Sequence, residues 1–191
     1  MDRIVTDNFS QMEEVLRVFS ASGALDDVDK AGTAMSETLA AGGKVISCGN
    51  GGSLCDAMHF AEELSARFRG NRRALAAEAI SDPAYITCVG NDFGFDNIFS
   101  RHIEAFGRKG DVLLAISTSG NSENVVRAAL AARDIGMKVV ALTGKNGGKL
   151  ADICDIEIRV PWDGYSDRVQ EIHIKVIHTL CQIVEQNLKL V

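Results

Sequence analysis

The chain has 191 residues, of which 46% are hydrophobic and only 2 are proline. That is enough for one well-buried domain and too short for two ordinary ones. Its formal net charge of −6 argues against nucleic acid and anionic membranes as partners, so we expect a single domain over residues 1–191 that binds a small molecule.

Two helices are predicted before the first strand. Residues 7–20 carry apolar side chains at helical spacing: Phe9, Met12, Val15, Leu16 and Phe19. A second helix is predicted over residues 29–41, because two glycines follow it and glycine commonly follows a helix end.

Strands and helices then alternate along the chain. We predict a strand at 44–48, a helix at 53–68, a short strand at 76–80, short helices between 83 and 107, a strand at 111–116, a helix at 123–135, strands at 138–143 and 155–160, and a long helix at 166–188. Strands separated by helices imply a parallel sheet that is covered on both faces. Ligands of such sheets bind at the carboxyl ends of the strands.

Two Gly/Ser turns fall at those carboxyl ends. Residues 48–53 read Cys-Gly-Asn-Gly-Gly-Ser, and residues 117–122 read Ser-Thr-Ser-Gly-Asn-Ser. Each leads into a helix, whose free N–H groups and partial positive charge can hold a phosphate without a lysine. Neither turn has the glycine pattern of a dinucleotide or nucleoside triphosphate site. One such turn alone could be a plain strand-to-helix connection, but two at one sheet edge favour a phosphorylated sugar as ligand.

Polar side chains on two helices are candidates for metal binding and acid–base chemistry. His59 and Glu63 share a helical face and could supply two zinc ligands, although this spacing is also common in surface hydrogen bonds. In the last helix, Gln170, Glu171, His173 and His178 interrupt an apolar pattern and must find partners. Periodicity does not choose between the two histidines, and a hydrogen-bonded core histidine is the alternative for either one.

The N-terminus and the cysteines indicate the compartment. Residues 1–7 are acidic and polar, unlike a signal peptide, and no uncharged run approaches membrane-spanning length. The 5 cysteines form no Cys-x-x-Cys pair, which fits reduced thiols and argues against a four-cysteine zinc cage. We therefore expect a cytoplasmic protein.

Five segments resemble the sedoheptulose 7-phosphate isomerases, also called phosphoheptose isomerases, of the sugar isomerase (SIS) family. They are CGNGGSLCDAMHFAEEL, VGNDFGFDNIFSR, DVLLAISTSGNS, VVALTGKNGG and RVQEIHIKVIH, and the resemblance extends over essentially the whole chain. The resemblance implies an α/β fold: a three-layer, flavodoxin-like SIS sandwich with a parallel sheet and extra N-terminal helices. It also implies a homotetramer with sites at subunit interfaces, to whose assembly the helices of residues 1–41 contribute.

The same resemblance implies particular site residues. One Zn²⁺ per subunit is expected on His59, Glu63, Gln170 and His178. Contacts to the phosphate and sugar are expected from Asn50, Gly51, Gly52, Ser53, Asn91, Asp92, Ser117, Thr118, Ser119, Ser122 and Gln170.

An aldose–ketose isomerase moves a hydrogen between C1 and C2, most simply through a cis-enediolate, and needs a proton shuttle and an electrophile. We expect Glu63 to be the base, His178 the acid at the sugar oxygen, and Zn²⁺ the Lewis acid. A group bound to zinc cannot use the same lone pair as a base, so the division between ligand and acid–base roles stays open. Glu62 and Asp167 are further candidates for proton transfer or for orienting the groups that perform it.

The expected reaction converts sedoheptulose 7-phosphate to D-glycero-D-manno-heptose 7-phosphate in ADP-heptose and lipopolysaccharide precursor synthesis. Two alternatives are kept: a non-catalytic SIS-domain protein that binds a partner such as a replication initiator, and an isomerase of a shorter phosphosugar. Arg67, Arg69, Arg72 and Arg73 could attract phosphate or form a solvated or intersubunit charge cluster.

Overall fold

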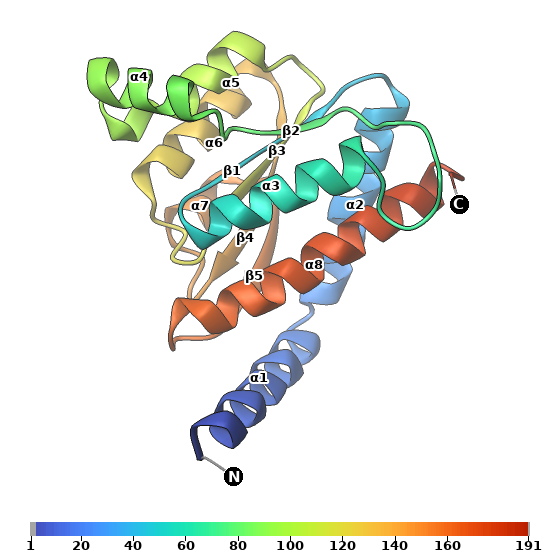
Figure 1. Ribbon diagram of the computed structural model, residues 1–191, viewed down its shortest axis with the longest axis vertical. Coiled ribbons are helices and arrows are strands. Elements are labelled where there is room, and N and C mark those ends of the chain that lie inside the picture. Colours follow the sequence, from blue (N-terminus) through green and yellow to red (C-terminus); the bar gives the residue numbers. More distant parts are fainter. Residues whose placement is uncertain (1–2, 191) are drawn as a thin grey trace.

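The computed structural model describes residues 3–190, and these contain a five-stranded, fully parallel sheet (Figure 1). Its strands are β1 (Val45–Gly49), β2 (Ala77–Ala79), β3 (Val112–Ser117), β4 (Lys138–Gly144) and β5 (Ile156–Val160). They are ordered β2-β1-β3-β4-β5, as in flavodoxin-like sheets. The chain reverses direction across the sheet between β1 and β3, and the two Gly/Ser turns follow these two strands. Ligands bind at such a crevice in open α/β sheets.

Helices cover both faces of the sheet, which gives three layers. The helices are α1 (Arg3–Ala21), α2 (Ala24–Ala40), α3 (Gly52–Ser65), α4 (Pro83–Phe93), the 3₁₀ turn η1 (Phe95–Asn97), α5 (Ser100–Phe106), α6 (Glu123–Ile135), α7 (Gly148–Ile153) and α8 (Ser166–Asn187). Buried residues of α1, α2, α3 and α8 form one core, and those of α4 to α7 form the other. In β3, Leu114 faces the first core and Leu113 the second, because side chains alternate along a strand. The predicted parallel sheet covered on both faces is confirmed.

Three element boundaries differ from the prediction by three or more residues, and one helix was not predicted. α1 begins before residue 7, and α2 begins at Ala24 rather than at 29, directly after Gly23. Gly23 has a φ of 86°, and two aspartates occupy the first turn of α2, where negative charge favours a helix N-terminus. α3 ends at Ser65 rather than at 68. The unpredicted α7 is only 6 residues long, too short to show an apolar period.

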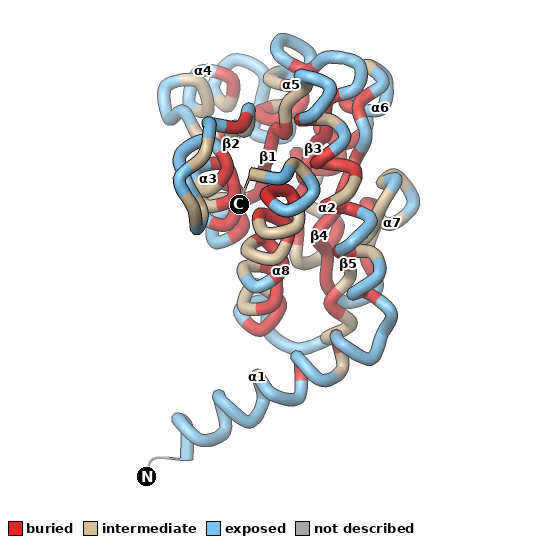
Figure 2. Tube along the Cα trace, turned by 90° about the vertical axis from the view of Figure 1, so that its right-hand side faces the viewer, coloured by how far each residue is buried: buried red, intermediate tan, exposed pale blue. Residues whose placement is uncertain are grey.

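The N-terminal half of α1 projects away from the sheet (Figure 2). Its buried side chains, Val15 and Phe19, lie toward its C-terminal end. Val5, Phe9 and Leu16 are 52%, 72% and 44% exposed, and their spacing places them on one helical face. α1 thus carries an uncovered apolar stripe.

Across residues 3–190, none of the helices combines the length and apolar character needed to cross a membrane. The cytoplasmic location stays a prediction from the sequence.

Candidate functional site

The first Gly/Ser turn leads from β1 into the N-terminus of α3. Gly51 has a φ of 55° and a ψ of −121°, a conformation that side chains with a Cβ rarely adopt. The N–H groups of Ser53 and Leu54 donate to the carbonyls of Asn50 and Gly51 at 3.0 Å each. The N–H groups of Gly51 and Gly52 lie at the tip of the turn and the first helical position, where an anion is bound by a helix N-terminus.

The second turn leads from β3 into α6. The hydroxyls of Ser117 and Ser122 lie 3.0 Å apart, and the N–H of Asn121 donates to Ser119 Oγ at 3.1 Å. Gly120 has a φ of 65°, and a Cβ there would lie 1.8 Å from the carbonyl oxygen of Gly147. Only glycine fits this position, so the turn packs tightly against the start of α7.

A pair of amides joins the two turns. Asn50 Nδ2 donates to Asn124 Oδ1 and Asn124 Nδ2 donates to Asn50 Oδ1, both at 2.9 Å. Asn124 lies in the first turn of α6 and is 2% exposed. Asn50 was predicted as a substrate contact, whereas sequence reasoning missed Asn124, whose only signal is an amide just after the second turn. The pair fixes the separation of the two turns.

At the other end of α3, the packing of α8 gathers three of the four predicted metal ligands. His59 Nε2 lies 2.9 Å from His178 Nε2 and 3.4 Å from Glu63 Oε1. One ligand atom from each of these three residues lies within 4.8 Å of the others. We call His59, Glu63 and His178 the ligand cluster.

A carboxylate orients one ring of this cluster. His59 Nδ1 lies 2.9 Å from Glu62 Oε1, and since a carboxylate accepts, Nδ1 must carry the hydrogen. With the hydrogen on Nδ1, the tautomer that a metal ligand needs would present the lone pair of Nε2 to the cluster. Two imidazoles and a carboxylate are a donor set that Zn²⁺ prefers at catalytic sites, so the residues present fit the predicted ion.

Asp56 is a further carboxylate of α3 that sequence reasoning missed. It precedes His59 by one turn and is 9% exposed, and among the described residues its buried Oδ2 has no hydrogen-bond partner. Burial raises the pKa of Asp56 to about 6, against a smaller opposing effect of His59.

Gln170, the fourth predicted ligand, lies at the turn end of the site. A Cβ on Gly52 would lie 2.7 Å from Gln170 Nε2, so this amide covers the start of α3. Gly52 and His59 are seven residues apart, which is roughly 10 Å of helix rise. α8 follows α3 in the same direction, with Gln170 beside Gly52 and His178 beside His59. Gln170 is therefore placed better for the substrate contact predicted for it than for the ligand cluster.

The two candidate histidines of α8 have different surroundings. His173 is fully buried, and its Nε2 donates to the carbonyl of Thr143 at 3.0 Å. Burial lowers the pKa of His173 to about 4. His173 is thus a core histidine, while His178 lies in the ligand cluster.

The remaining predicted residues lie apart from the ligand cluster or on the surface. Asn91 and Asp92 are exposed on α4, where Asn91 Nδ2 donates to Asp92 Oδ1 at 2.7 Å. Asp167 is exposed at the start of α8. Of the four predicted surface arginines, Arg72 differs, because its side chain is only 1% exposed and is paired with Glu185.

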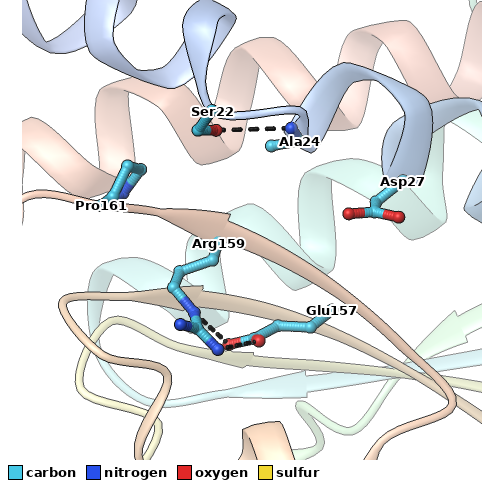
Figure 3. Close-up of a pocket in the computed structure, with 6 residues that line it drawn as sticks. All are labelled: Ser22, Ala24, Asp27, Glu157, Arg159 and Pro161. Atoms are coloured by element: carbon cyan, nitrogen blue, oxygen red, sulfur yellow. Dashed lines mark hydrogen bonds and ion pairs between the residues drawn. The ribbon is translucent and has the colours of Figure 1, made fainter.

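A separate hollow of about 310 Å³ lies between the junction of α1 and α2 and the edge strand β5 (Figure 3). Its lining includes Arg159, which is paired with Glu157. None of the predicted site residues lines this hollow, so we do not assign the predicted chemistry to it.

Comparison with known proteins shows which family this chain resembles. The family model described as SIS domain matches residues 7–144. The phosphoheptose isomerases of Escherichia fergusonii and of Escherichia coli K12 are each 57% identical over 186 residues, which is 97% of this chain and 97% of each relative.

Solved structures of phosphoheptose isomerases superpose closely on the chain. That from Neisseria gonorrhoeae has a TM-score of 0.91 and 39% identity, covering 96% of this chain and 98% of its own. That from Francisella tularensis has a TM-score of 0.92 and 39% identity, covering 97% and 100%.

Proposed function

The chain belongs to the SIS domain family and, at 57% identity over 97% of its length, to the phosphoheptose isomerases within it, and from this premise we propose that it interconverts sedoheptulose 7-phosphate and D-glycero-D-manno-heptose 7-phosphate. As a member of the phosphoheptose isomerases, the chain is an isomerase. One observation carries the proposal further: α3 begins at a phosphate-type turn and, two turns later, places His59 in the ligand cluster.

The phosphate is held at the two Gly/Ser turns. Main-chain N–H groups of Gly51 and Gly52 and the hydroxyls of Ser53, Ser117, Thr118, Ser119 and Ser122 are the proposed donors. The Asn50–Asn124 pair keeps both turns at a fixed separation, and the amide of Gln170 lies beside them. Asn91 and Asp92 are proposed to contact the sugar from α4.

Proton transfer is assigned to the ligand cluster. Glu63 is the proposed base that moves the proton between C1 and C2, and His178 the proposed acid at the sugar oxygen, a role that its ring can take only through a nitrogen that does not bind the metal. The carboxylate of Glu63 has two oxygens, so one can bind a cation while the other accepts a proton. The carboxylate of Glu62 holds the ring of His59 and leaves Glu63 free for this role.

We propose His59, Glu63 and His178 as zinc ligands, whereas Gln170, the fourth predicted ligand, is proposed as a substrate contact because it lies beside Gly52. When bound, Zn²⁺ would act as a Lewis acid that polarises the sugar carbonyl and stabilises negative charge on its oxygen.

We further propose a homotetramer with the sites at subunit interfaces. The apolar stripe of α1 supports it, because a second copy of the chain would bury Val5, Phe9 and Leu16. The domain of residues 1–191 would then use its first helices, about residues 1–41, for assembly. The product would enter ADP-heptose and lipopolysaccharide precursor synthesis.

The alternatives make different demands on the ligand cluster. A non-catalytic partner-binding protein has no chemical need for two imidazoles and a carboxylate in mutual contact, so the cluster favours the enzyme. An isomerase of a shorter phosphosugar would need the same groups, and only substrate length separates it from the proposed reaction.

The test is to mix purified protein with five-, six- and seven-carbon ketose phosphates and to follow aldose formation, with and without added Zn²⁺. We expect turnover to be fastest with sedoheptulose 7-phosphate and to fall after chelation. No turnover of any substrate with added Zn²⁺ contradicts the enzyme, and faster turnover of a shorter substrate favours the second alternative.

A further inference from the structure

We infer that Arg72 is a positioning residue for the ligand cluster: its guanidinium joins the C-terminal end of α3 to α8 and so sets the spacing between Glu63 and His178. The inference rests on the proposed function, because it assigns Arg72 to the same site. Arg72 acts through the main chain of Glu63 and through the carboxylate of Glu185.

The first contact is with the end of α3. The last carbonyls of a helix lack donors within the helix and must find them elsewhere. Arg72 Nη2 donates to the carbonyl of Glu63 at 2.7 Å, and Nη1 donates to that of Leu64 at 2.8 Å. The same residue that places its carboxylate in the ligand cluster is thus held by its main chain from outside the helix.

The second contact is with α8. Arg72 Nε donates to Glu185 Oε1 at 2.7 Å, and both side chains are only 1% exposed. Glu185 lies seven residues after His178, so the two residues share one face of α8. One guanidinium is therefore bound to both helices that supply the ligand cluster.

The segment of α8 between Glu185 and the ligand cluster is packed into the protein interior. Cys181 lies between His178 and Glu185 along the helix and is fully buried. Burial raises the pKa of Cys181 to about 12, so its thiol is neutral. Because packed interiors transmit displacements, a shift of α3 against α8 at Arg72 would move Glu63 relative to His178.

The geometry requires an arginine at this position. A guanidinium has five N–H donors in a rigid fork, whereas an ammonium is a single point that cannot hold two carbonyls and a carboxylate in these directions. The neighbouring Arg73 is exposed and offers a matched control for loss of charge. Lys44, paired with Asp111 at 2.7 Å at the opposite end of β1, offers a control for loss of a partly buried ion pair.

The experiment measures Co²⁺ binding to the metal-free protein by visible absorption, which does not depend on turnover. We expect Arg72→Met to weaken Co²⁺ binding at least about tenfold and Arg72→Lys to recover part of that loss. Arg73→Met and Lys44→Met should stay within about twofold of the unmodified protein. If the Co²⁺ affinity of Arg72→Met also stays within about twofold of the unmodified protein, the inference is overturned.

A second readout needs neither metal nor turnover. The Cε1–H resonances of His59 and His178 in NMR spectra report their surroundings, and Arg72→Met should shift them while Lys44→Met leaves them in place. Should Arg72→Met not fold, Glu185→Gln serves instead, because it keeps an acceptor oxygen but removes the charge. Unshifted resonances overturn the inference. If the unmodified protein binds no Co²⁺, the metal proposal is wrong and these resonances alone decide the role of Arg72.

Discussion

The two ends of the site are built from different parts of the chain. At the turn end, main-chain groups after β1 and β3 line the site, and several hydroxyls surround them. At the cluster end, three side chains from α3 and α8 meet within 4.8 Å of one another. Binding that is shared among many donors tolerates the loss of one, whereas each group of the ligand cluster has a task of its own in the proposed reaction. The turn end should therefore be robust to substitution and the cluster end fragile.

The largest effect is expected for Glu63→Gln. The amide keeps the shape but cannot accept the proton, so we expect kcat to fall about a thousandfold, or about 4 kcal/mol, with KM little changed. Steady-state kinetics with sedoheptulose 7-phosphate measure this. Glu62→Gln is the matched control and should cost much less, because Glu62 only orients His59. If the kcat of Glu63→Gln stays within about tenfold of that of the unmodified enzyme, the proposed contrast between the two ends is wrong.

A second test uses His173, the histidine of α8 that lies in neither end of the site. Its folded pKa of about 4 lies below the usual value of 6.5, so the unfolded chain binds the proton more readily than the folded one. The free energy of unfolding should therefore be highest above about pH 6.5, where His173 is neutral in both states. It should decline as the pH falls toward 4 and be lower by about 2 kcal/mol at pH 5. Urea unfolding at several pH values measures it, and His173→Gln should flatten this part of the profile. An unchanged profile would mean that His173 is not the neutral core group described above.

The smallest effect is expected at the turn end, for Asn124→Ala. Loss of the amide pair frees one turn from the other, and we expect KM to rise about tenfold, or about 1.4 kcal/mol, with kcat nearly unchanged. Asn187→Ala is the control, since Asn187 bonds to Ser36 away from both turns. A loss in kcat comparable to that of Glu63→Gln would show that the turn end is as fragile as the ligand cluster.

Local patterns in the sequence predicted most of the fold and the turn end. Each Gly/Ser turn is a contiguous stretch of the sequence, so both turns can be recognised without knowing the fold, whereas the contact of Gly120 with Gly147 is visible only in the structure. The order of strands and helices followed from apolar periodicity. The short helix α7 was not predicted, because its 6 residues make less than two turns of a helix and so show no apolar period.

Long-range packing decided what the sequence left open. Apolar periodicity does not choose between His173 and His178, and only the placement of Thr143 and His59 separates a core histidine from one in the ligand cluster. Arg72 was grouped with exposed arginines because its partner, Glu185, lies 113 residues away in the sequence. The place of Gln170 likewise depends on how α8 crosses the start of α3.

Helix α3 links the two ends of the site and fixes the distance between them. Between Gly52 and His59, α3 advances roughly 10 Å in steps of about 1.5 Å per residue and cannot contract to follow a shorter molecule. A sugar tethered by its phosphate must bridge that span with its own carbon skeleton for its carbonyl to reach the reactive groups. Chain length would then be selected by a rigid distance, and inserting or deleting a whole turn of α3 is the change that should re-set it.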